Sequence, residues 1–155
     1  MGPLGLRHSV AATLGGLAAI HAAWAFTSWP LSDRARFAEV VAGASPDRAP
    51  SAVATLGVAT LLAQSAVLVA QCHSCDRGRQ VGGLSLYGTR TVACALLARA
   101  TAGFVVSGGR LQPLPDSFRR LDLTVYSPLC LVLGTGAAVV ASSASPAARR
   151  AGSRR

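Results

Sequence analysis

The stretch "LTVYSPLCLVLGTGAAVVASSAS", residues 123–145, contains no Arg, Lys, Asp or Glu. A helix needs about 20 predominantly apolar residues to cross the ~30 Å hydrocarbon core of a membrane, so this stretch predicts a membrane-spanning helix. Residues 9–29 and 51–71 meet the same criterion, and residues 91–109 meet it apart from Arg99. The sequence therefore predicts an all-α fold, a bundle of four transmembrane helices at about 9–29, 51–71, 88–108 and 122–145.

The composition supports this prediction. The chain has 155 residues, of which 51% are hydrophobic and only 14% charged, whereas about 25% of the residues of a soluble domain are charged. Four crossings leave no room for a separate soluble domain. We expect a single integral membrane domain at residues 1–148 and a disordered basic tail at residues 149–155.

The first apolar stretch also allows a second interpretation. Arg7 precedes it, and Ala23-Trp24-Ala25 is similar to the small-residue cleavage site of a signal peptide. The stretch continues to Trp29, however, and two tryptophans near its end are typical of a membrane–water interface. The sequence favours a retained transmembrane helix.

All fifteen basic residues are arginine, and the net charge is +9. In a soluble protein this balance would indicate nucleic-acid binding. Here the arginines flank apolar stretches, where they set topology and contact anionic headgroups, and no aromatic residues accompany the basic tail to stack on bases. We therefore expect membrane lipids and no nucleic acid as partners. The arginine distribution slightly favours a multi-pass protein of the cell membrane with both termini in the cytoplasm.

The loop "PLSDRARFAEVVAGASPDRAP", residues 30–50, is too long for a simple turn. Phe37, Val40 and Val41 follow helical spacing, which predicts a short helix in the headgroup region. Such a helix either caps the outer mouth of the bundle or fills space. In the last helix, Gly134 and Gly136 indicate close approach of neighbouring helices.

Polar residues of three predicted helices share one depth. At ~1.5 Å per residue, His21 and Arg99 each lie about 12 Å below the outer surface, while Asp122 starts the last helix and Tyr126 lies one turn deeper. An arginine at this depth costs ~2.5–3.5 kcal/mol unless it faces the protein interior and finds partners. The Asp122 carboxylate and the Tyr126 hydroxyl are the natural partners. Pro128 has no backbone N–H, so a carbonyl one turn earlier, near Thr124, lacks its helical hydrogen bond. This carbonyl is another polar group that needs a partner.

We expect these residues to form an outer-half polar pocket that binds a lipid-like or amphiphilic small molecule. Its candidate ligand-binding residues are His21, Trp24, Arg99, Asp122 and Tyr126. The alternative is a structural or assembly subunit in which the same groups only hold helices together. No nucleophile or cofactor motif identifies a reaction, and we expect no cofactor.

The motif "CHSC", residues 72–75, gives a further alternative. Cys72 and Cys75 could form a redox pair, and the arrangement resembles quinone-linked thiol oxidoreductases of the vitamin K epoxide reductase type. On the predicted topology, however, the pair faces the reducing cytoplasm and lacks a second pair in an outer loop. Zinc would need four ligands, so no metal is expected. Cys94 and Cys130 are interpreted as core residues.

The sequence also resembles a known family. "HAAWAF" at residues 21–26, an arginine in the third helix and "FRRLDLTVYSPLC" at residues 118–130 are similar to small bacterial four-helix integral membrane proteins that form a domain of unknown function. This chain has "AFTS" where the family has glycines. The resemblance implies a four-helix membrane protein and no particular activity.

Overall fold

The computed structural model describes residues 3–31, 33–45, 48–72 and 80–144, and its secondary structure in these ranges is helical. The all-α prediction is therefore confirmed. The predicted basic tail lies outside the described residues. The elements are α1 (Pro3–Trp24), α2 (Arg34–Phe37), the π-helical η1 (Ala38–Ala42), α3 (Ala52–Gln71), α4 (Gln80–Gly108), α5 (Asp116–Leu121), the π-helical η3 (Asp122–Tyr126) and α6 (Ser127–Ala144).

The helix boundaries differ from the predicted ones in three places. α1 ends at Trp24 rather than at residue 29, because the chain turns there and the Trp24 indole nitrogen donates to the Trp29 carbonyl at 2.8 Å. α4 starts at Gln80 instead of residue 88. The last helix starts at Asp116, directly after Pro115, so Asp122 lies inside the helix and not at its start. The predicted bounds come from the length of each apolar stretch, which indicates only the part of a helix inside the membrane. The helix itself continues until a capping residue or a proline ends it.

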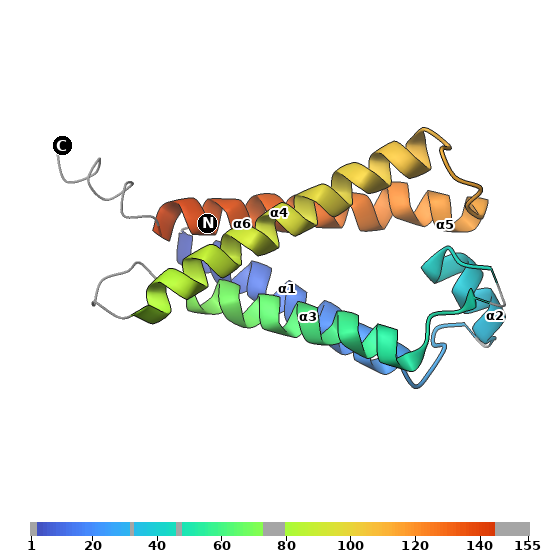
Figure 1. The fold of residues 1–155 in the computed structure, drawn as a ribbon, viewed down its shortest axis with the longest axis horizontal. Helices are drawn as coiled ribbons and strands as arrows, with labels where there is room; N and C mark the ends of the chain where they lie inside the picture. The colour runs from blue at the N-terminus through green and yellow to red at the C-terminus, as the bar shows by residue number, and fades with distance from the viewer. Residues whose placement is uncertain (1–2, 32, 46–47, 73–79, 145–155) are drawn as a thin grey trace.

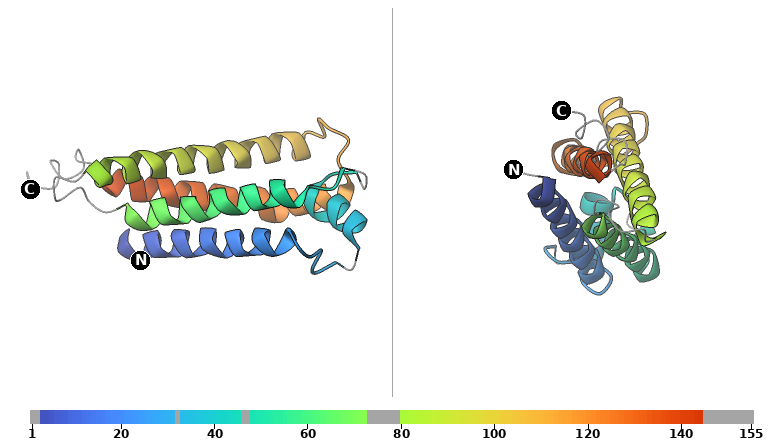
Figure 2. Two further views of the ribbon diagram at one scale, coloured as in Figure 1. Left: turned by 60° about the horizontal axis from the view of Figure 1, so that its bottom comes forward. Right: turned by 90° about the vertical axis from the view of Figure 1, so that its left-hand side faces the viewer.

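The four long helices of the described chain form two pairs (Figures 1 and 2). α1 runs along α3, and α4 runs along α6. The pairs converge at the end where α1 begins, and they diverge toward the end that holds α2 and α5 (Figure 1). We call this second end the cap end.

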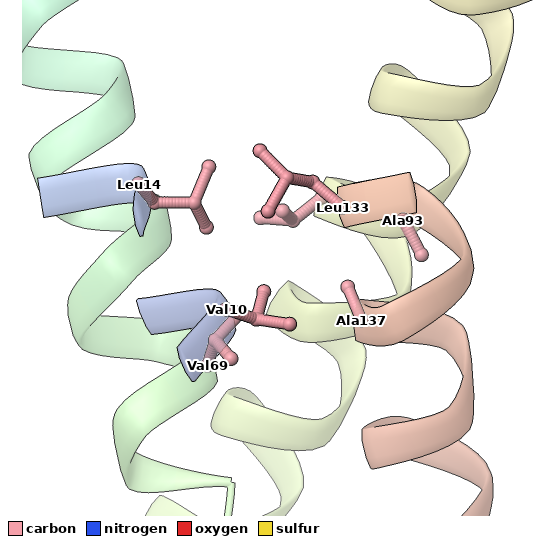
Figure 3. Close-up of a cluster of buried hydrophobic side chains, with 7 residues drawn as sticks. Val10, Leu14, Val69, Ala93, Leu133 and Ala137 are labelled. Atoms are coloured by element: carbon pink, nitrogen blue, oxygen red, sulfur yellow. The ribbon is translucent and has the colours of Figure 1, made fainter. Parts of the chain in front are cut away.

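One apolar core joins the two pairs. Leu14 and Val10 of α1 point toward Leu133 and Ala137 of α6, and Val69 of α3 lies beside them (Figure 3). Val92 and Ala93 of α4 complete the cluster, so all four long helices contribute to it. The glycines of α6 allow this approach, as the sequence predicts. A Cβ at Gly134 would lie 2.9 Å from Leu97 of α4, and one at Gly136 would lie 2.8 Å from Val10.

Three helices in the described residues are long and apolar enough to cross a membrane: Ala52–Gln71, Gly83–Gly108 and Asp116–Ala144. Many of their exposed side chains are large and apolar, for example Val53, Leu61 and Val132, which are 80%, 65% and 67% exposed. These properties are those of a multi-pass membrane protein. α1 has 22 residues but is not among these three helices, and its apolar stretch is interrupted by Arg7 and His8 near its start and by His21 near its end.

The predicted short helix in the first loop is present as α2 and η1, which we call the cap. The Asp33 carboxylate caps it by accepting hydrogen bonds from the Ala35 and Arg36 amides, at 3.2 and 3.3 Å. The Phe37 ring packs on Trp24 of α1, with ring centroids 5.3 Å apart. At the other end of the cap, Gly43 has φ 64° and lies so near α5 that a Cβ would be 2.7 Å from the Phe118 ring. The cap therefore contacts both helix pairs where they diverge.

Candidate functional site

A polar cluster lies inside the α4–α6 pair around Asp122, whose side chain is only 2% exposed. Arg99 Nη2 donates to Asp122 Oδ1 at 2.7 Å, which is the pairing that the sequence predicts. Ser107 Oγ donates to Oδ2 at 2.5 Å, and Ser127 Oγ donates to Oδ1 at 3.2 Å. The carboxylate is thus held by one cation and two hydroxyls, as a buried charge requires.

The π-helical turn η3 gives Asp122 and Ser127 their relative position. Residues three or four apart share a face of an α-helix, but these two are five apart. In η3 the Ser127 amide instead bonds to the Asp122 carbonyl, so the wider turn brings residues five apart together. η3 ends at Tyr126, two residues before Pro128, which has no N–H to donate to the carbonyl four residues earlier. The proline step in "YSPLC" thereby helps to place Ser127 beside the carboxylate.

Gly103 of α4 allows the cluster to form. A Cβ at this position would overlap Ser127 Oγ and would lie 2.6 Å from Arg99 Nη1 and 2.9 Å from Asp122 Oδ2. The space that any larger residue would fill is therefore occupied by the polar groups themselves. Gly103 is itself buried, so α4 lies directly against the cluster at this point.

Arg99 differs from its partner in exposure. Its side chain is 44% exposed, although it lies within the candidate span Gly83–Gly108. Its bond to Asp122 uses Nη2, and among the described residues no hydrogen-bond acceptor is found for Nε or Nη1. One side of the guanidinium is bound to the protein, and the other is available.

Tyr126 lies beside this cluster but does not join its hydrogen bonds. Its ring packs against Phe118 with centroids 6.0 Å apart. Within the described chain its hydroxyl has no hydrogen-bond partner, so the expected Arg99–Tyr126 bond is absent there. Tyr126 is half-buried as a residue, and its hydroxyl keeps both its donor and its acceptor capacity.

His21 and Trp24 belong to a different part of the molecule, the α1–α3 pair. They line a pocket of about 210 Å³ under the cap. The His21 ring packs edge-on against Trp24 at 5.0 Å, and its Nδ1 lies 2.8 Å from the Leu17 carbonyl oxygen. The remaining lining residues are Phe37, Val41, Ala42, Pro50, Ala54, Thr55 and Val58. The structure thus divides the five predicted ligand-binding residues into two groups.

The cysteines show no second site in the described part of the chain. Cys72 is buried at the end of α3, and Cys75 lies outside the described residues. Cys94 is exposed on α4, so its interpretation as a core residue is wrong, whereas Cys130 is half-buried. No group of three or more His, Cys, Asp or Glu side chains that could hold a metal occurs in the same described ranges.

Sequence reasoning missed Ser107, Ser127 and Gly103. Serine and glycine are frequent in membrane helices, so their presence alone carries no signal. The five-residue spacing from Asp122 to Ser127 becomes informative only once a π turn is inferred from Pro128. Gly103, four residues after Arg99, could have been read as space left for the guanidinium.

Comparison with protein-family models finds a match over residues 14–137, to the model described as "Protein of unknown function (DUF3995)". The matched region includes both residue groups described above. The chain matches no curated protein and no solved structure.

Proposed function

The chain belongs to the DUF3995 family of proteins of unknown function, and we propose from its geometry that it binds the polar or anionic head of an amphiphilic small molecule within the membrane, at Arg99. We further propose that α1 is a fourth crossing beside the three candidate spans, with both termini in the cytoplasm. The exposed apolar side chains of the helices then contact membrane lipids.

The observation that carries this proposal is the free side of Arg99. The guanidinium lies nine residues before the end of the span at Gly108, or ~13 Å along the helix axis. Hydrocarbon supplies no acceptor at that depth, and an unsatisfied polar group there costs several kcal/mol. The head of an amphiphile supplies such an acceptor while its tail stays among the lipids.

The surrounding residues prepare the guanidinium for this role. Ser107 and Ser127 hold the Asp122 carboxylate, and the carboxylate fixes one edge of Arg99. A preorganised donor loses little freedom when a ligand binds. Asp122 also offsets the arginine charge, so the site suits a polar head as well as an anionic one. The unpaired Tyr126 hydroxyl supplies a second hydrogen bond.

The main competing function is that of a structural or assembly subunit. The Asp122 network is satisfied by protein groups, and a purely structural cluster would also look like this. It would not, however, leave half of an arginine side chain exposed within a span. For the thiol oxidoreductase no described contact adds support, because Cys72 is buried and Cys75 lies outside the described residues.

The test is mass spectrometry of small molecules that co-purify with the full chain in lipid particles. The informative variants are Arg99→Met/Asp122→Asn, which removes both charges together, and Tyr126→Phe. The matched control is Arg90→Met, since Arg90 lies on the same helix, is exposed and lies over the Tyr87 ring, at 5.9 Å from its centroid.

We expect an amphiphile that accompanies the wild type and the control, is reduced in Tyr126→Phe and is lost from the charge-free double variant. If folded samples of all four proteins carry the same species, or none carries any, the proposal is wrong. The structural role would then be the better explanation.

A further inference from the structure

The pocket under the cap points to a second binding site. We propose that it binds a small aromatic molecule of one or two rings that carries a hydroxyl or N–H group. The pocket lies between α1, the cap and α3, whereas the Arg99 site lies on the α4–α6 pair. The two sites use different residues, so this inference stands independently of the proposed function.

The polar atoms of the pocket define the hydrogen bonding of the ligand. A carbonyl oxygen can only accept, so His21 Nδ1 donates its hydrogen to Leu17. In the neutral imidazole Nε2 is then an acceptor, and no donor to it is found in the described residues. The Thr55 hydroxyl donates to the Ser51 carbonyl at 3.0 Å, which leaves its oxygen to accept. The Trp24 N–H is used by Trp29. The free acceptors of the lining residues therefore favour a ligand that donates.

The walls of the pocket favour an aromatic ligand. Trp24 meets His21 at an interplanar angle of 61° and Phe37 at 68°, the edge-to-face geometry that aromatic rings prefer. Val41, Pro50 and Val58 provide apolar surface around these rings. A ligand ring can extend the same series of contacts, since each such pair adds favourable energy beyond burial alone.

The volume limits the size of the ligand. An apolar cavity of about 150 Å³ is known to hold benzene. The pocket measures about 210 Å³, which corresponds to one ring with substituents or to two fused rings. It is too small for the whole of a lipid.

The position of the pocket provides a route of entry. Phe26 and Trp29, which follow α1 at the cap end, are 77% and 71% exposed. Exposed aromatic side chains at the end of a span are typical of the membrane–water interface. Aromatic molecules with one polar group gather at the same depth, so the ligand reaches the pocket from the interface.

The experiment uses the full chain in lipid nanodiscs and two probes of nearly equal shape. Indole carries an N–H donor, and indene does not. Calorimetric titration of each probe is corrected with empty nanodiscs, which removes partition into lipid. We expect saturable binding of indole about fivefold tighter than that of indene, because one hydrogen bond contributes about that factor.

Two variants test the assignment to this pocket. His21→Leu removes the acceptor and should abolish the preference for indole over indene. Ala54→Leu fills the pocket without touching His21 and should abolish binding of both probes. Ala63→Leu makes the same change at an exposed position of α3 that does not line the pocket, and it should bind as the wild type does.

Equal binding of the two probes to the wild type would overturn the proposal, as would unchanged indole binding in folded Ala54→Leu. If His21→Leu does not fold, the Ala54 and Ala63 variants still decide the matter. Ala54→Leu changes no residue of the Arg99 site, so loss of probe binding in this variant is an outcome separate from that of the co-purification test.

Discussion

Gly103→Ala is the change that most directly tests the close approach of α4 to the polar cluster. The new methyl group would overlap Ser127 Oγ and lie 2.9 Å from Asp122 Oδ2. Ser127 is fully buried, so its hydroxyl can move away only by giving up its bond to the carboxylate. The substitution should therefore weaken the cluster without introducing any polar or charged group.

The expected loss of stability is about 2 kcal/mol. A hydrogen bond to a charged group contributes ~1.5–3 kcal/mol, and overpacking costs ~1–3 kcal/mol. The two costs are not fully additive, because the side chain relieves the overpacking by breaking the hydrogen bond. We therefore take about 3 kcal/mol for both together. Replacing glycine by alanine within a helix returns up to about 1 kcal/mol. Subtracting this gain leaves a net loss of about 2 kcal/mol in the free energy of unfolding.

The measurement is reversible unfolding of the purified chain in mixed micelles, followed by circular dichroism as the denaturing detergent increases. Gly57→Ala is the matched control, because a Cβ at Gly57 of α3 meets nothing within 4 Å. It should leave stability unchanged or raise it by up to about 1 kcal/mol.

A double-mutant cycle identifies the cause. Ser127→Ala removes the overlapping oxygen, so it should lessen the cost of Gly103→Ala by at least about 1 kcal/mol, a coupling typical of residues in contact. If the two changes add within ~0.5 kcal/mol, or if Gly103→Ala is as stable as Gly57→Ala, the close approach described here is wrong.

Two further predictions concern the ion pair and the topology. Arg99→Met leaves the buried Asp122 without its cation and should destabilise the chain by ~3–5 kcal/mol. Adding Asp122→Asn should recover much of this, because the neutral amide can accept from one serine hydroxyl with its oxygen and donate to the other with its NH2 group. Equal stability of the single and double variants in the unfolding assay would contradict a buried charge at Asp122. Alkaline phosphatase, which is active only outside the cytoplasm, should be active when fused after Ser45 and inactive when fused after Arg155. The opposite pattern would reverse the proposed orientation.

Much of the fold could be predicted because long uncharged stretches are a direct physical requirement of membrane crossing. α3 matches its predicted bounds within one residue. The Arg99–Asp122 pair was also predictable, since an arginine within a span demands a partner. The helix ends were less accessible. Hydrophobicity does not report where capping residues and prolines start or stop a helix.

The site was predicted less completely, because depth along a helix does not specify which helix is the neighbour. His21 and Arg99 were placed together by depth, yet α1 packs along α3, and His21 contacts Leu17 and Trp24. The pairing of helices depends on packing along their whole length, for example where Gly134 of α6 meets Leu97 of α4. A single pair of polar residues cannot reveal it.

The π turn η3 has a consequence for chain length. α5, η3 and α6 form one continuous helix, in which Phe118 faces the cap while Gly134 and Gly136 face Leu97 and Val10. An α-helix rotates by about 100° per residue. Deleting one residue from 122–126 would keep the helix intact but turn the glycines away from both neighbours. The number of residues between Phe118 and Gly134 therefore aligns two packing surfaces, and it is as strictly required as the identity of the side chains that form them.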